Sequence, residues 1–137
     1  MRYSKEVMKN FMDPKNMGEI KNPDGVGKVG NPTCGDIMHV FIKVGKKGTK
    51  DEFIKDIKFQ TFGCAAAIAT SSMITQLAKG EKISDAKKIK IKNIAKSLKG
   101  LPEIKMHCGE MAAEALGKAI EDYNKKKLKG KRKKGLE

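Results

Sequence analysis

The feature that most restricts the fold is an alternating pattern between Ile37 and Val44. One face of a strand there would carry four apolar side chains: Met38, Val40, Ile42 and Val44. Successive strand residues point to opposite faces, so this alternation is typical of a strand with one buried face. A glycine-bounded turn at residues 45–48 follows, and the next stretch keeps one parity for Phe53, Ile57, Phe59 and Thr61. The sequence therefore predicts an antiparallel strand pair.

The segment before this pair is rich in residues that break helices. Residues 13–36 are dense in Gly, Pro, Asn and Asp, which favours turns and extended backbone. Within it, the Gly-Val-Gly-Lys-Val-Gly stretch at residues 25–30 predicts an edge strand weakened by glycine. Residues 1–12 predict a short helix, with these side chains near one face: Tyr3, Val7, Met8, Phe11 and Met12.

Helical patterns dominate the second half of the chain. A helix is expected after Cys64, with Gly80 as its stop. Ser84 and Asn93 are the expected caps of two short helices. Leu101 and Pro102 then interrupt the chain.

The longest helix is expected from about Met106 to Lys126, with an apolar stripe along one side. The fold class is therefore α+β: a small, about three-stranded antiparallel sheet with helices packed over one face and a long C-terminal helix. Residues 1–126 are expected to form one domain. Residues 127–137 are expected to form a basic, disordered tail, because a run of like charges cannot pack on itself.

The formal net charge of +14 suggests an acidic partner or nucleic acid, but much of it is terminal. The last 13 residues hold 8 of the 30 basic residues and only 1 of the 16 acidic ones. A basic nucleic-acid-binding module is one functional hypothesis. The absence of Trp, with only two Tyr and five Phe, leaves few platforms on which bases could stack, and this argues against it.

The chain has neither a segment long and apolar enough to span a membrane nor a recognisable export signal. We therefore expect a cytoplasmic protein with no membrane partner. Its three cysteines are an odd number, and thiols stay reduced in that compartment. Inert core thiols, reactive thiols and metal ligands are the remaining alternatives.

Each cysteine stands beside a glycine: Cys34-Gly35, Gly63-Cys64 and Cys108-Gly109. A glycine would let backbone approach a metal-bound sulfur. Each cysteine also lies at an expected element boundary, and helix N-termini favour the thiolate at Cys64 and Cys108. A single cysteine is more often an inert core residue, but three in this setting favour binding of a metal or a cluster.

Two further donors accompany the thiols, Asp36 after Cys34 and His107 before Cys108. Three thiolates with a carboxylate and an imidazole suit Zn²⁺ or sulfide-bridged iron. The chain lacks CxxC pairs, so the site would be incomplete and suited to handing a metal group onward. Lys105 is either a surface lysine or a cation that stabilises the Cys108 thiolate.

His39 stands apart from these donors and is expected to be non-functional. A nucleophilic Cys-His enzyme is disfavoured, because adjacent residues on one helical turn point in different directions and no third orienting group is evident. We therefore expect no enzymatic activity.

Three ordered segments resemble the signatures of IscU/NifU-type iron–sulfur cluster assembly scaffolds, which include the NifU N-terminal domain. They are Gly30-Asn31-Pro32-Thr33-Cys34-Gly35-Asp36-Ile37-Met38, Thr61-Phe62-Gly63-Cys64-Ala65 and Leu101-Pro102-Glu103-Ile104-Lys105-Met106-His107-Cys108. The similarity runs from Tyr3-Ser4 through Asn16-Met17-Gly18 to the last long helix. His107, with no insertion before Cys108, places the chain on the IscU side rather than with the SufU branch.

The resemblance implies a scaffold that assembles a labile iron–sulfur cluster of the [2Fe-2S] type and passes it to apo iron–sulfur client proteins. Sulfur would arrive from a pyridoxal-phosphate cysteine desulfurase as a persulfide, with Cys108 as acceptor. Cys34, Cys64 and Cys108 would be ligands, Asp36 would tune lability, and His107 would be a fourth or exchanging ligand. Zn²⁺ is able to occupy such sites in the resting protein.

Two implications of the resemblance concern partners. Leu101, Pro102 and Lys105 belong to the family's segment for an Hsp70-type chaperone, but Glu103 replaces its second proline, which puts that partner in doubt. The chain would work as a monomer or a dimer.

A zinc-binding sulfur acceptor that stimulates the desulfurase is the alternative function.

Overall fold

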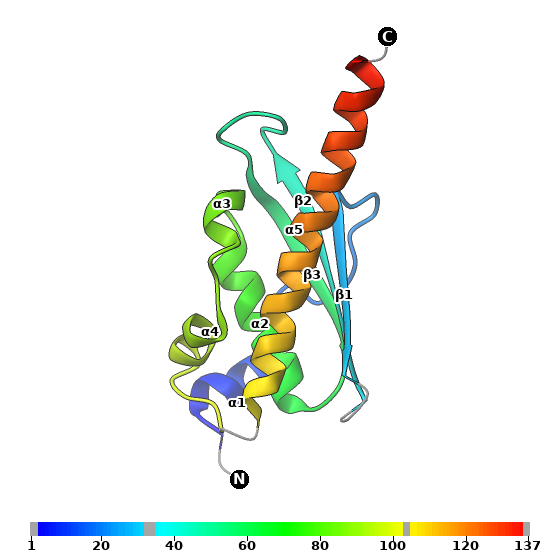
Figure 1. Ribbon diagram of the computed structural model, residues 1–137. Helices are drawn as coiled ribbons and strands as arrows, with labels where there is room; N and C mark the ends of the chain where they lie inside the picture. The colour runs from blue at the N-terminus through cyan, green and yellow to red at the C-terminus, as the bar shows by residue number, and fades with distance from the viewer. Residues whose placement is uncertain (1–2, 32–34, 103–104, 136–137) are drawn as a thin grey trace.

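The structure is a three-stranded antiparallel sheet with helices on one side, and this computed structural model describes residues 3–31, 35–102 and 105–135 (Figure 1). The strands are β1 (Gly25–Asn31), β2 (Asp36–Gly45) and β3 (Phe53–Phe62) in the order β1-β2-β3. The helices are α1 (Lys5–Met12), α2 (Ala65–Ala78), α3 (Ile83–Ala86), α4 (Ile91–Ser97) and α5 (Met106–Gly135). The α+β class is confirmed.

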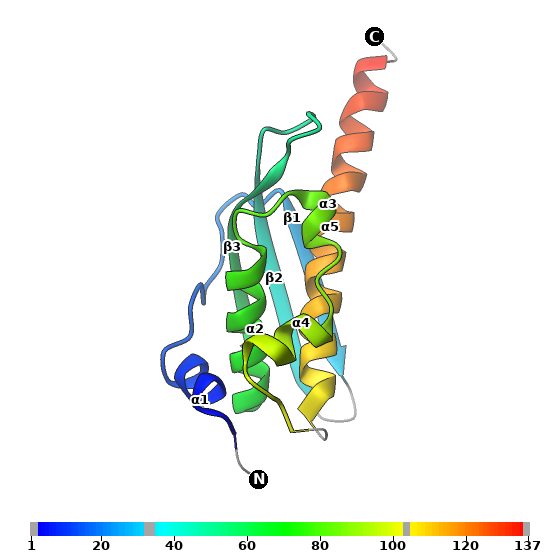
Figure 2. The same cartoon turned by 90° about the vertical axis from the view of Figure 1, so that its left-hand side faces the viewer.

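The alternating pattern in β2 has the predicted orientation. Met38, Val40, Ile42 and Val44 are all buried against α2 and α5, which contact the same face of the sheet (Figure 2). In β3 the predicted parity holds for Ile57 and Phe59, but at the start of the strand Ile54 is buried and Phe53 is half-buried. The pairing register shifts at this point: Lys43 pairs with Asp56, but Val44 pairs with Ile54. The strand β3 therefore holds one extra residue, Lys55, which turns the side chains before it to the opposite faces.

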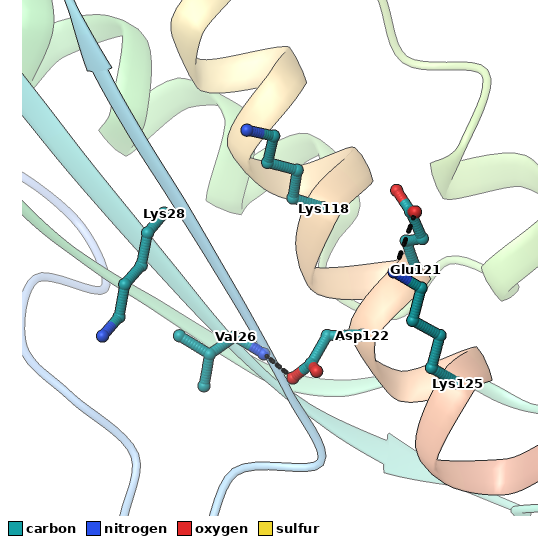
Figure 3. Close-up of a pocket in the computed structure, with 6 residues that line it drawn as sticks. All are labelled: Val26, Lys28, Lys118, Glu121, Asp122 and Lys125. Atoms are coloured by element: carbon teal, nitrogen blue, oxygen red, sulfur yellow. Dashed lines mark hydrogen bonds and ion pairs between the residues drawn. The ribbon is translucent and has the colours of Figure 1, made fainter. Parts of the chain in front are cut away.

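The glycines of β1 allow α5 to pack closely on the edge strand. A Cβ added at Gly27 would overlap the Ala115 carbonyl oxygen, and one at Gly25 would overlap that of Ala119. The free edge of β1 is partly capped, since Asp122 accepts a 2.9 Å hydrogen bond from the Val26 N–H (Figure 3). The glycines predicted to weaken this edge strand therefore position α5.

Helix α1 exposes two side chains that the sequence placed on its apolar face. Val7 is fully buried, whereas Met8 and Met12 are 41% and 74% exposed. Asn10 takes a place in the buried face instead, because its Oδ1 accepts hydrogen bonds from Ser72 Oγ and Gln76 Nε2 of α2. Polar side chains of α2 thus decide which way α1 faces, and the prediction for Met8 and Met12 is wrong.

The two short helices exist, but the predicted caps are wrong. The caps are Lys82 for α3 and Lys90 for α4. Ser84 lies inside α3, whereas the Asn93 side chain accepts a hydrogen bond from the Lys90 backbone N–H. Asn93 thus supports the start of α4 from its first turn. Gly80 follows the end of α2 at Ala78 and has a φ of +86°, as expected for a left-handed glycine that stops a helix.

Helix α5 continues past its predicted end near Lys126 to Gly135. Ion pairs one turn apart, Glu121–Lys125 and Asp122–Lys126, support the helix at that point. Lysine and leucine are also good helix formers, so the sequence gives no strong stop there. The expected tail is therefore helical over residues 127–135, and the division of the chain at residue 126 stays a prediction.

Within the part of the chain that the structure describes, no helix has a run of side chains apolar enough to cross a bilayer.

Candidate metal centre

Three elements begin or end at one end of the sheet and bring four predicted donors together. Asp36 is the first residue of β2, and Cys64 is the N-cap of α2 directly after β3. Antiparallel pairing of Ile37 with Phe62 sets the start of β2 beside the end of β3. His107 and Cys108 lie in the first turn of α5, which begins at the same end.

Cys108 is the central residue of this group. Its Sγ lies 3.5 Å from His107 Nε2 and 3.7 Å from Asp36 Oδ2. The Sγ atoms of Cys64 and Cys108 are 3.9 Å apart. His107 Nε2 and Asp36 Oδ2 are also 3.9 Å apart, so one ligand atom from each of Asp36, His107 and Cys108 lies within 4.8 Å of the others.

These separations fit one tetrahedrally coordinated zinc ion shared by the donors. Zn–S bonds of about 2.3 Å and Zn–N or Zn–O bonds of about 2.0 Å put neighbouring ligand atoms roughly 3.3–3.8 Å apart. The separations between the Asp36, His107 and Cys108 ligand atoms, 3.5–3.9 Å, are close to that range. Small side-chain rotations would bring Asp36, His107 and Cys108 onto one metal, with the Cys64 thiol next to Cys108.

Burial dominates the electrostatics of Cys108. Its side chain has no exposed surface and packs with Ala66 and Ala67 of α2. This desolvation, with the negative charges of Cys64 and Asp36, raises the pKa of the Cys108 thiol far above its usual range. The metal-free thiol is therefore protonated, and a bound cation is needed to hold it as the thiolate that ligates metal.

Lys105 interacts with both described thiols. The negative charge of Cys64 is the first cause that raises the pKa of Lys105, and Cys108 contributes less. The positive charge of Lys105 in turn opposes the rise in the pKa of the Cys108 thiol, in the direction that the sequence suggested. The Lys105 backbone N–H donates a 2.8 Å hydrogen bond to the Pro102 carbonyl.

Two of the glycines beside the cysteines also make room for side chains from other segments. A Cβ at Gly63 would lie 2.7 Å from Asp36 Oδ1, so this glycine makes room for the carboxylate. A Cβ at Gly109 would press on the Ile91 side chain of α4. Among the described residues, no atom outside the chain neighbours lies within 4 Å of a Cβ added at Gly35, but its φ of +74° favours glycine for conformational reasons.

The remaining predicted site residues lie as follows. Cys34 and Glu103 fall outside the described residues. Leu101 and Pro102 are half-buried, and Leu101 packs against the small cluster that contains Cys108. His39 lies mid-strand on the outward-facing side of β2, edge-on to Phe41, and is not part of the donor group.

One residue near the site was not predicted to belong to it. Tyr3 is partly buried and packs against the cluster of Ala66, Ala67 and Cys108. The sequence places Tyr3 on the first helix and at the start of the family similarity, whereas α1 begins only at Lys5. No local motif links Tyr3 to a cysteine 105 positions further along, so only the tertiary structure identifies this contact.

Comparisons with known proteins agree with the geometry. A family model described as the NifU-like N terminal domain matches residues 2–130. The iron-sulfur cluster assembly scaffold protein IscU 1 of Archaeoglobus fulgidus is 56% identical over 124 residues, which cover 90% of this chain and 78% of that protein. The IscU scaffold protein of Rickettsia prowazekii is 46% identical over 130 residues, which cover 93% and 95% of the two chains.

A solved structure of the N-terminal part of a NifU-like protein from Brucella abortus has a TM-score of 0.69. It is 18% identical, and the match covers 89% of this chain and 94% of that one, which supports the fold. The resemblance drawn from the three sequence segments is confirmed. The chain belongs to the NifU-like N-terminal domain family.

Proposed function

We propose that this chain is a scaffold on which a labile iron–sulfur cluster is assembled and from which the cluster passes to apo-proteins. The observation that carries the proposal is the contact of the buried Cys108 thiol with Asp36, His107 and Cys64 at separations of 3.5–3.9 Å. The names of the relatives from Archaeoglobus and Rickettsia support it. The cluster is cargo, so the protein would not be an enzyme.

The donor set suits a cluster that must leave again. Cysteine thiolates are the usual ligands of such clusters, and we assign that role to Cys34, Cys64 and Cys108. Asp36 offers a harder oxygen, which binds the cluster iron less firmly than sulfur does. His107 is one-third exposed, so it would act as a fourth or exchanging ligand at the open side of the site.

The supply and delivery steps need partners. The proposal includes a [2Fe-2S] cargo, sulfur delivered as persulfide by a pyridoxal-phosphate cysteine desulfurase, and apo iron–sulfur proteins as recipients. It places the cycle in the cytoplasm, where reducing conditions keep the thiol ligands free of disulfides.

Anaerobic reconstitution tests the scaffold role. Protein incubated with ferrous iron, cysteine and a cysteine desulfurase should gain visible charge-transfer absorption and acid-labile sulfide. His107→Ala should change that spectrum or shorten the cluster's lifetime. The matched control is His39→Ala, which removes a histidine outside the donor group and should behave as wild type.

A second function is favoured by one feature of the site. The group of Asp36, His107 and Cys108 has the donors and spacing of a zinc site without any sulfide. The protein would then be a zinc-binding sulfur acceptor that stimulates the desulfurase. Wild-type protein that stays colourless under reconstitution, yet binds one zinc ion, would favour this second function over the scaffold.

A further inference from the structure

The two described thiols differ in access although they are in contact. Cys64 is half-buried at the start of α2, whereas Cys108 has no exposed surface. A thiol that takes sulfur from another protein must touch the sulfur it attacks. A donor from outside can reach Cys64, but it cannot touch Cys108 in this conformation.

The distance between the thiols suggests how the buried one is loaded. A sulfur atom bonded to Cys64 would extend about 2 Å beyond its Sγ, the length of an S–S bond. The gap to Cys108 Sγ is 3.9 Å. A terminal sulfur on Cys64 would therefore be in van der Waals contact with Cys108 after a simple rotation of the side chain.

We propose that sulfur enters the site on Cys64 and is relayed across this gap to Cys108. The inference rests on the scaffold function proposed above, and it changes the order of events expected from the sequence, in which Cys108 is the direct acceptor. Cys64 becomes the entry thiol and Cys108 the holding thiol, shielded from solvent by Ala66 and Ala67.

The relay step is balanced without an oxidant or a reductant. The sulfur of the Cys108 thiol attacks the terminal sulfur of the Cys64 persulfide and forms a new S–S bond while the thiol gives up its proton. The bond between that terminal sulfur and Cys64 Sγ breaks, and its electron pair stays on Cys64 Sγ. Cys64 then takes up the proton that Cys108 released, so one thiol and one persulfide are present before and after.

A time course of persulfide labelling tests the order. Metal-free, full-length protein would be mixed with glutathione persulfide, quenched with an alkylating reagent and digested, and the Cys34, Cys64 and Cys108 peptides would be quantified by mass spectrometry. In wild type, the persulfide on Cys64 should appear first and decay as that on Cys108 rises. This measurement needs no variant, so a folding defect cannot obscure it.

Two variants sharpen the result. Cys108→Ser should accumulate persulfide on Cys64, and Cys64→Ser should lower the initial rate of Cys108 labelling at least tenfold. The control is Met12→Ser, which replaces a sulfur-containing side chain that is 74% exposed and holds no thiol. It should label as wild type does.

Several outcomes would overturn the relay. They are Cys108 labelling at the wild-type rate in Cys64→Ser, first labelling of Cys34 or Cys108 in wild type, and conversion of the pair to a disulfide with release of free sulfide. Cluster reconstitution of the wild-type protein is read separately. A failed relay with normal cluster formation leaves the scaffold function standing, and a working relay without a cluster removes the scaffold function alone.

Discussion

Gly63 and Asp36 are fitted to each other: a methyl group at residue 63 would lie 2.7 Å from the Asp36 Oδ1 atom. The Asp36 side chain is only 7% exposed and faces Cys108 and His107. The absence of a side chain at the end of β3 thus determines where a potential metal-binding carboxylate stands at the start of β2.

Gly63→Ala should displace the Asp36 carboxylate and weaken zinc binding by about tenfold, because one of the clustered donors moves out of position. Competition with a chromophoric chelator measures the affinity. The control is Gly117→Ala on α5, where an added Cβ meets nothing within 4 Å. Equal zinc affinities for the two variants would contradict a role for Asp36 in the site.

Asp36→Ala should make a reconstituted cluster persist longer. In the scaffold proposal, this carboxylate is the displaceable oxygen ligand, and its removal also takes away a polar group that admits water. The half-life of the visible absorption in the presence of a chelator is the measurement. Faster loss of the cluster than in wild type would show that Asp36 strengthens binding instead of tuning release.

Gly27→Ala should destabilise the fold by about 1–3 kcal/mol, because the added methyl group overlaps the backbone of α5 and forces the helix off the edge strand. Gly117→Ala should do the opposite and stabilise by up to about 1 kcal/mol through helix propensity. Urea unfolding compares the two free energies. A neutral Gly27→Ala would mean that α5 and β1 are less closely packed than the structure has them.

Much of this architecture could be predicted from the sequence, because local patterns decide it. The period of Met38, Val40, Ile42 and Val44 fixes the buried face of β2, and the glycine stop at Gly80 is a local conformational signal. The structure brings Asp36, Cys64, His107 and Cys108 together in space, and their role as ligands stays a prediction. Residue chemistry and motif spacing suffice for such predictions.

The errors share a physical cause, which is contact between distant segments. Asn10 is buried because α2 offers it Ser72 and Gln76, and nothing near residue 10 indicates this. Gly63 makes room for Asp36, from which 27 positions separate it, and no pattern near residue 63 indicates this contact. The stability of α5 beyond Lys126 likewise depends partly on Lys127, whose Nζ reaches Glu52 in the segment that leads into β3.

Tyr123→Phe should lower the free energy of unfolding at neutral pH by about 2 kcal/mol, because the hydroxyl donates a 2.6 Å hydrogen bond to the Glu52 carboxylate. Burial alone would raise the pKa of Glu52. Hydrogen bonds from Tyr123, Lys127 and the Gly48 N–H outweigh burial and leave the pKa below its ordinary 4.5.

The sign of the pH dependence follows from that lowered pKa. As the pH falls, Glu52 takes up a proton near pH 4.5 in the unfolded chain, before it does so in the folded protein. The stabilisation by the ionised Glu52 carboxylate is therefore present above that pH and is lost as the pH falls through the folded pKa. The difference between wild type and Tyr123→Phe should therefore shrink in acid. A difference that stays constant down to pH 3 would contradict the assignment to an ionised Glu52.

Deletion of residues 128–137 should leave cluster formation and thermal stability unchanged. The cut keeps Tyr123 and Lys127, which hold Glu52, and it removes the outer turns of α5, which extend beyond the sheet (Figure 1). The donor group lies in the first turn of α5, about 20 residues or about 30 Å away along the helix. Fluorescence anisotropy with duplex DNA at low salt tests the hypothesis of a basic nucleic-acid-binding module. Affinity that falls with salt and disappears with the deletion would assign DNA binding to these last turns of α5, separate from the metal centre.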